Sequence, residues 1–100
     1  MKVLKKPVHF QWDKGNSSKN LNKHGVHDNE CEEAFFDPHK KILQDKKHSI
    51  LPEKRYILLG RTGAGRLLFL VFTIRGSSIR IISARDLNHK ERTLYGKKAT

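Results

Sequence analysis

Three apolar runs in the second half of the chain predict β-strands. They read RYILLG, RLLFLVFTIR and SIRIISA, over residues 55–60, 66–75 and 78–84. Aromatic and β-branched residues are frequent in these runs, and glycine-containing segments separate them, which is typical of strands joined by short turns. The pattern therefore predicts an antiparallel meander of three strands.

Residues typical of helix starts and ends predict three helices elsewhere in the chain. Residues 14–25 predict a weak helix, since glycine and asparagine lower its propensity, with Gly25 as its C′ residue. Residues 28–36 predict a second helix with an acidic first turn. A short helix is expected near the end of the chain, where Asn88 and Glu91 have the spacing of a capping box.

The remaining segments predict little regular structure. Val8, Phe10 and Trp12 alternate with polar residues, which is the period of a short half-buried strand. Residues 40–44 predict another short strand, whereas the polar, proline-bearing residues 45–54 predict a loop.

Together these elements predict an α+β fold in which an antiparallel β-sheet packs against two N-terminal helices, with a short C-terminal helix. A chain of 100 residues has the length of one domain, so residues 1–100 are expected to form a single domain. A basic N-terminal tail is expected over residues 1–7 and a frayed C-terminal tail over residues 96–100.

The second hairpin has a predictable register. A two-residue turn at Gly76-Ser77 places Arg75 opposite Ser78. Counting back along both strands gives the further pairs Ile74–Ile79, Thr73–Arg80, Phe72–Ile81, Val71–Ile82 and Leu68–Arg85. Cross-strand partners share a face, so one face is expected to be an apolar core with Arg85 at its rim. The other face is expected to be cationic and hydroxylated at one end, where it carries Arg75, Ser78, Thr73 and Arg80.

The stretch GRTGAGR, residues 60–66, has two glycines at the spacing of a phosphate-binding P-loop. A P-loop also requires a lysine and then a serine or threonine, but Arg66 and Leu67 stand in those places. A helix should follow as well, whereas the next residues predict a strand. We therefore expect a hairpin with a five-residue loop.

Positive charge is the strongest signal in the composition. The chain has 21 Lys and Arg against 10 Asp and Glu, which gives a net charge of +11. Such a charge favours polyanions, because neutralised phosphates release condensed counterions. Adhesion to the ribosome and an acidic protein partner are the alternatives.

The single cysteine, Cys31, excludes an intramolecular disulfide framework. Its acidic neighbours are expected to raise the pKa of its thiol, which argues for a structural residue. The lysines near the N-terminus interrupt any apolar run of signal-peptide type, and no apolar segment is long enough to span a membrane. The expected location is the cytoplasm.

Several motifs occur together in an order that resembles the BrnT toxin family. They read FQWD, NLNKHGV, ECEEAFFDP, RYILLG, GRLLFLVFTIR and RIISARDLNHKERTLY. The resemblance covers residues 8–95, and the combination of K-H-G-V, T-x-R and R-I-I-S-A-R is more specific than any single motif. The helix start at KGNSSK is more polar than is usual in the family, and residues 44–53 depart from it.

The resemblance implies a RelE-like α+β fold and a ribonuclease toxin of a type II toxin–antitoxin system. Cleavage of RNA would arrest translation. The implied partner is an antitoxin of the BrnA type with a ribbon-helix-helix domain, and the complex would repress its own operon by binding operator DNA.

Metal-free RNA cleavage needs a base, cations that stabilise the phosphorane, and an acid. The histidines and acids show no metal-ligand spacing, so neither a metal nor another cofactor is expected. Arginine suits phosphate oxygens, and Arg75, Arg80 and Arg55 are the candidates for charge stabilisation. His24 is the candidate for proton transfer, with Lys23 holding the phosphate, although both residues also suit a helix C-terminus.

Four further residues are candidates for binding RNA: Thr73, Tyr95, Lys40 and Lys41. Tyr95 has the alternative role of anchoring the last helix to the sheet. The two lysines have the alternative role of a solvated surface. Arg85 is expected in an ion pair with a helix carboxylate, either Glu33 or Glu91.

Two functions fit the sequence. The first is a metal-independent endoribonuclease toxin that a DNA-binding antitoxin neutralises. The second is a non-catalytic nucleic-acid-binding or co-repressor module. Growth of cells that express the chain without its partner distinguishes the two.

Overall fold

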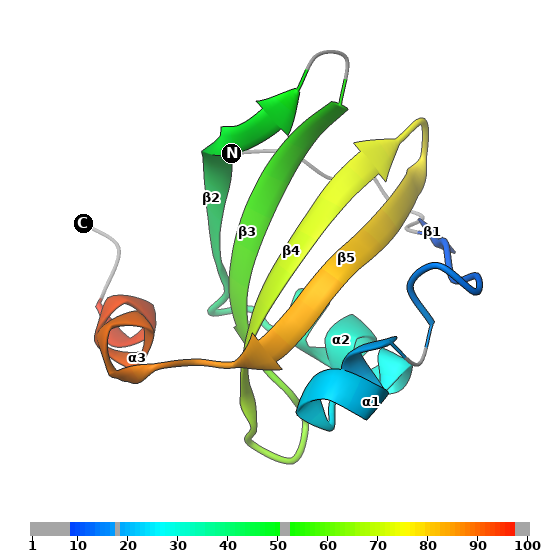
Figure 1. Ribbon diagram of the computed structural model, residues 1–100. Coiled ribbons are helices and arrows are strands. Elements are labelled where there is room, and N and C mark those ends of the chain that lie inside the picture. Colours follow the sequence, from blue (N-terminus) through cyan, green and yellow to red (C-terminus); the bar gives the residue numbers. More distant parts are fainter. Residues whose placement is uncertain (1–8, 18, 51–52, 98–100) are drawn as a thin grey trace.

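The fold is built on one five-stranded sheet with the strand order β1-β5-β4-β3-β2 (Figure 1). The computed structural model describes residues 9–17, 19–50 and 53–97. The strands are β1 (His9–Phe10), β2 (Lys41–Ile50), β3 (Glu53–Arg61), β4 (Leu67–Arg75) and β5 (Ser78–Asp86). The predicted meander is confirmed for β3, β4 and β5, and β2 extends it by a fourth antiparallel strand. The sheet as a whole is mixed, because β1 pairs parallel to β5.

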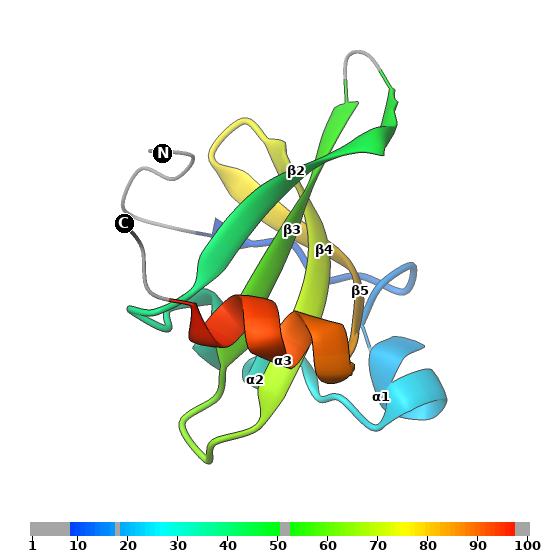
Figure 2. The ribbon, with the colours of Figure 1, turned by 90° about the vertical axis from the view of Figure 1, so that its left-hand side faces the viewer.

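The helices lie on both faces of the sheet. They are α1 (Lys19–His24), α2 (Asp28–Phe35) and α3 (His89–Gly96). Figures 1 and 2 show α1 and α2 on one face and α3 across the other. The predicted capping box of α3 is confirmed, since the Asn88 side chain accepts from the Glu91 N–H and the Glu91 carboxylate accepts from the Asn88 N–H, each at 2.9 Å.

The prediction of a loop over residues 45–54 was wrong. Strand β2 continues to Ile50 and β3 begins at Glu53, with a register shift between Asp45 and Ile50. A strand at the edge of a sheet pairs through its backbone, and charged residues are common there because they discourage further pairing. The polar composition of this segment therefore reflects its place at the edge.

The first helix begins later than the predicted start at residue 14. Residues 13–16 form a turn instead, in which the buried side chain of Asn16 replaces helical hydrogen bonds. Its amide donates to the carbonyls of Gln11 and Ile81, at 2.8 and 3.0 Å, and its oxygen accepts from Asp13 N. This turn follows β1 along the edge of β5. Gly25, after α1, has a φ of +68°, as its predicted C′ role requires.

The short strand predicted over residues 8–12 is reduced to His9–Phe10, and Val8 lies outside the described residues. Trp12 lies beyond the strand and packs against the core, while its indole N–H donates to Glu32 at 2.8 Å. That bond ties the chain after β1 to α2.

The predicted register of the second hairpin is confirmed from Arg75–Ser78 to Phe72–Ile81. Beyond that point it was wrong, because β5 contains an irregularity opposite Val71 and Phe72. Val71 pairs with Ser83 instead of Ile82, and Leu68 pairs with Asp86 instead of Arg85. An extra residue in one strand shifts all later side chains to the other face.

Arg85 consequently lies on the face away from the core, opposite Phe69. Its guanidinium lies 4.0 Å from the centre of the Phe69 ring. The same group donates to both carboxylate oxygens of Glu91, at 2.7 and 2.8 Å. An ion pair between Arg85 and a helix carboxylate was predicted, and Glu91 is the partner.

The core lies between the sheet and the two N-terminal helices. Phe72 is fully buried at its centre, where its ring lies 5.1 Å from that of Phe35 and 5.4 Å from that of Tyr56. The buried core residues that surround it are Val26, Cys31, Ala34, Leu58, Leu68, Leu70, Ile79, Ile81 and Ala84. Burial is the largest cause that raises the pKa of the Cys31 thiol to about 12, followed by the acidic residues of α2. The predicted direction of this pKa shift is confirmed.

Gly60 allows α2 to approach β3 closely. A Cβ at this position would overlap the carbonyl oxygen of Ala34, which belongs to the backbone of α2. We therefore expect Gly60→Ala to lower the free energy of unfolding by about 1–3 kcal/mol or more. Thermal and denaturant unfolding measure the loss.

Gly63→Ala is the matched control. A Cβ at Gly63 would meet only the carboxylate end of Glu33, at 3.2 Å, which accepts from the Gly63 N–H and belongs to a long side chain that can shift by a few tenths of an ångström. Equal stability of the two variants would show that α2 does not depend on this close approach.

Candidate functional site

The cationic side chains of three adjacent strands meet on the sheet face opposite the core. In the observed register Arg55 of β3 lies beside Thr73 of β4, which lies beside Arg80 of β5. Strands are about 4.8 Å apart, so the Cα atoms of the two arginines are about 10 Å apart. Arg75 lies two residues further along β4, on the same face. We call these four residues the arginine face.

Carboxylates already hold two of these arginines. Arg80 donates to both oxygens of Asp13, at 2.7 and 3.1 Å, and Arg75 donates to Glu53 at 3.3 Å. The hydrogen bond from Arg80 is the largest cause that lowers the pKa of Asp13, and Asp13 raises the pKa of Arg80 in turn. A phosphate at the arginine face therefore competes with these carboxylates for the same donors.

Thr73 has its hydroxyl engaged in the sheet. The residue is fully buried, and the hydroxyl donates to the carbonyl of Lys54 at 2.9 Å. Its contribution is thus to hold β3 and β4 together between the two arginines.

His24 and Lys23 lie at the other end of β5. Both are exposed in the last turn of α1, and the charge of His24 contributes to lowering the pKa of Asp86. Asp86 is six residues beyond Arg80 in β5, which corresponds to about 20 Å of strand. The structure therefore divides the predicted catalytic residues into two groups that one phosphate cannot contact together.

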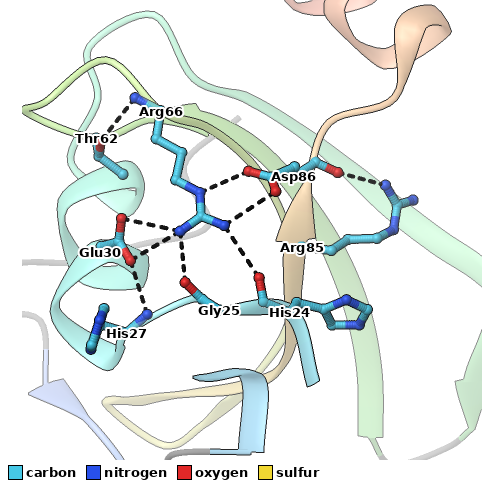
Figure 3. Close-up of polar contacts among 8 residues, drawn as sticks. All are labelled: His24, Gly25, His27, Glu30, Thr62, Arg66, Arg85 and Asp86. Carbon is cyan, nitrogen blue, oxygen red and sulfur yellow. Dashed lines mark hydrogen bonds and ion pairs between the residues drawn. The ribbon is translucent and has the colours of Figure 1, made fainter. Parts of the chain in front are cut away.

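Arg66, in the loop between β3 and β4, contacts the end of α1, the first turn of α2 and the end of β5 (Figure 3). Its guanidinium donates to both carboxylate oxygens of Asp86, at 2.7 and 3.1 Å, and to Glu30 Oε1 at 3.2 Å. It also donates to the carbonyls of Gly25, at 2.8 Å, and His24, at 3.3 Å. Both carbonyls are at the C-terminal end of α1, where a cation is favoured by the helix dipole.

The predicted five-residue hairpin loop between β3 and β4 is confirmed. The sequence indicated Arg66 only as a departure from the P-loop pattern, and its contacts were not predicted. The contact with Asp86 is the largest cause that raises the pKa of Arg66, and the contact with Arg66 lowers the pKa of Asp86. The partners are 20 to 42 residues away along the chain, so no local pattern reveals them.

Tyr95 anchors α3 to the connection between α2 and β2. Its hydroxyl donates to Asp37 at 2.5 Å, and the buried Asp37 carboxylate also accepts from the backbone N–H groups of His39 and Arg61. Burial and the bond to Asp37 raise the pKa of Tyr95 to about 12. Burial alone would raise the pKa of Asp37, but the three hydrogen bonds lower it.

The predicted RNA-binding residues Lys40, Lys41 and Tyr95 come together in one pocket of about 490 Å³. The pocket lies between α3 and the start of β2, and Arg61 of β3 adds a further cation. Within the described ranges no cluster of three or more His, Cys, Asp or Glu residues has the geometry to hold a metal ion. No helix in the same ranges has the length and apolar character needed to cross a membrane.

Comparison with protein families identifies the chain. The profile described as "Ribonuclease toxin, BrnT, of type II toxin-antitoxin system" matches residues 12–91. The chain belongs to the BrnT family. No curated protein matches it. The BrnT match includes the arginine face and the contacts of Arg66, and it ends before Tyr95.

We expect Arg66→Met to destabilise this BrnT protein by roughly 1–3 kcal/mol, because it leaves Asp86, Glu30 and two carbonyls without their shared donor. Part of the loss should depend on pH. Because Arg66 lowers the pKa of Asp86 below its usual 3.8, the stabilisation that comes from Asp86 is complete above that pH. This part disappears as pH falls through the lowered pKa, whereas the part that comes from the two carbonyls remains.

Denaturant unfolding of the wild type and of Arg66→Met at several pH values between about 2.5 and 7 measures this difference. Lys90→Met is the control, because Lys90 is an exposed cation of α3 that is not among the groups that shift the pKa of Asp86. A difference between wild type and Arg66→Met that stays constant down to the lowest pH would contradict the role of the carboxylates.

Proposed function

We propose that this BrnT-family toxin cleaves RNA at the arginine face without a metal ion. The observation that supports this most directly is the register that sets Arg55 and Arg80 on either side of Thr73, with Arg75 beside them. Arginine presents planar pairs of N–H donors that match phosphate oxygens. Three such groups on a rigid sheet suit a site where negative charge accumulates.

In the proposed reaction the ribose 2′-oxygen attacks the adjacent phosphorus, and the bond from phosphorus to the 5′-oxygen breaks. A base takes the proton of the 2′-hydroxyl, and an acid gives a proton to the leaving 5′-oxygen. Arg80 and Arg75 would exchange their carboxylate partners for the phosphorane oxygens. Asp13, whose pKa is lowered by Arg80, would hold the Arg80 guanidinium in place before RNA binds.

A second location for the reaction follows from the position of His24. If His24 transfers a proton, the reacting phosphate lies at the Asp86 end of β5, beside Lys23, and away from Arg80. The two locations are mutually exclusive for one phosphate, since about 20 Å of strand separates them. We favour the arginine face because it gathers several fork-shaped donors.

The family membership supports an antitoxin partner. We propose that it is of the BrnA type with a ribbon-helix-helix domain, that the complex represses its own operon, and that the toxin acts in the cytoplasm. We further propose that the sheet and its helices are a variant of the RelE-like fold. The net charge of +11 supports both an RNA substrate and a partner with an acidic surface.

Expression of the chain alone should arrest growth and deplete intact RNA, and co-expression of the adjacent antitoxin gene should prevent both effects. The purified protein should cleave RNA in the presence of EDTA. Growth curves and gel analysis of RNA measure these effects. Normal growth at confirmed soluble expression would favour the non-catalytic co-repressor, and a requirement for added divalent ions would refute the mechanism.

Arg80→Ala should reduce cleavage about 10²-fold or more, since it removes a donor aimed at the charge that develops in the transition state. Arg80→Lys should restore only part of the rate, because an ammonium retains the charge but loses the paired donors. Stability should change by less than about 1 kcal/mol, as for other surface ion pairs. Single-turnover cleavage assays and thermal unfolding give both quantities.

Ile81→Ala is the structural control for Arg80. It removes a fully buried side chain from the opposite face and should cost about 2–5 kcal/mol of stability. His24→Ala tests the second location. Full activity of Arg80→Ala together with inactive His24→Ala would move the site to the end of α1.

A further inference from the structure

The pocket beside α3 differs from the arginine face in the state of its cations. Arg66, Arg75, Arg80 and Arg85 each form an ion pair with a carboxylate. Within the part of the chain that the structure describes, no such pair involves Lys40, Lys41 or Arg61, and no acidic residue lines the pocket. Lys40 and Lys41 donate to backbone carbonyls, those of Asp37 and Lys97.

Asp37, whose carboxylate lies beside this pocket, already accepts three hydrogen bonds. Asp37 accepts hydrogen bonds from Tyr95, His39 and Arg61, but the last two come from backbone N–H groups. The Arg61 side chain is exposed and lines the pocket from β3. Lys97, after α3, adds a fourth cation. The pocket therefore has an excess of positive charge that the described residues do not neutralise.

The walls of the pocket suit a nucleotide better than a protein surface. A volume of about 490 Å³ lies in the range of small-molecule sites. The Tyr95 ring lines the pocket while its hydroxyl is fixed by Asp37, so the ring has a defined orientation. Aromatic rings stack with nucleic-acid bases, and lysine and arginine bind the phosphate.

We propose that this pocket binds one nucleotide of single-stranded RNA at a distance from the phosphate that is cleaved. The cations Lys40, Lys41, Arg61 and Lys97 hold its phosphate, and Tyr95 contacts its base. This inference rests on the proposed function for its substrate. Arg61 is six residues from Arg55 in β3, so about 20 Å of strand separates the pocket from the arginine face.

A second contact at this distance would set a minimum length for the RNA. A short oligonucleotide would reach the arginine face or the pocket, whereas a longer strand would reach both. The pocket would then increase affinity and leave the chemical step unchanged.

The test uses a fluorescein-labelled 2′-O-methyl oligouridylate of about 12 nucleotides, which lacks the attacking hydroxyl and stays intact. Fluorescence anisotropy at a series of KCl concentrations gives the affinity and its salt dependence. Each phosphate contact on a single strand contributes about 0.7 to the slope of log K against log salt. Because all four cations hold one phosphate, the slope should decrease in magnitude by at most about 0.7, both in Arg61→Ala and in the double variant Lys40→Ala/Lys41→Ala.

Lys90→Ala is the matched control, because it removes one positive charge from the exposed N-terminal turn of α3, outside the pocket. It should leave the slope unchanged. Arg61→Ala keeps the backbone N–H that donates to Asp37, so its fold should be intact, and thermal unfolding checks this. Tyr95→Leu should weaken binding without changing the slope, since it removes a ring and no charge.

The outcomes separate this proposal from the proposed function. Wild-type cleavage with equal slopes in Arg61→Ala and Lys90→Ala would overturn the pocket and leave the ribonuclease. Binding that depends on Arg61 in a protein that never cleaves RNA would support the pocket and refute the ribonuclease. Loss of antitoxin binding in Arg61→Ala, with RNA binding unchanged, would overturn the nucleotide in favour of an acidic protein segment.

Discussion

The contacts of Arg66 hold together the end of α1, the start of α2, β5 and the loop between β3 and β4. Helix α1 has six residues, too few to be stable alone, and its C-terminal carbonyls receive N–H donors from the hairpin loop between β3 and β4. The same guanidinium holds Glu30, which also accepts from the backbone N–H of His27 at the start of α2. One side chain thus fixes the end of one helix and the start of the next against the sheet. The position of Lys23 and His24 depends on it.

Carboxylates pair with four arginines of this protein. A net charge of +11 suggests an uninterrupted basic surface, but Arg66, Arg75, Arg80 and Arg85 each form an ion pair with a carboxylate. Pairing on the surface contributes little stability, so its main effect is to orient the guanidinium groups. An oriented group loses less entropy when it binds a phosphate. The pocket beside α3 differs, because within the described residues no carboxylate forms an ion pair with Lys40, Lys41 or Arg61, so these cations can pair with a ligand.

The sequence predicted the central sheet well because its signals are local. Apolar alternation and the Gly76-Ser77 turn determine the pairing from Arg75 to Phe72, and this pairing places Arg80 beside Thr73. The family resemblance was likewise confirmed from motifs. Only the first part of β2 was predicted, as a short strand over residues 40–44, because the rest of an edge strand needs only a backbone partner. The Arg80–Asp13 contact joins residues 67 positions apart, and no local pattern indicates such a contact.

The irregularity in β5 changes which residues of that strand lie on the same face of the sheet. Arg80 and Arg85 are five residues apart, an odd number that would put them on opposite faces of a regular strand. The extra residue returns Arg85 to the face that carries Arg80. Both arginines therefore pair with residues of that face, Arg80 with Thr73 and Arg85 with Phe69. Without it, Arg85 would point toward the core and Ala84 would leave it. A deletion of a single residue in the sequence Ile81-Ile82-Ser83 would therefore exchange the inside and outside of half a strand, although every other residue of the strand would be unchanged.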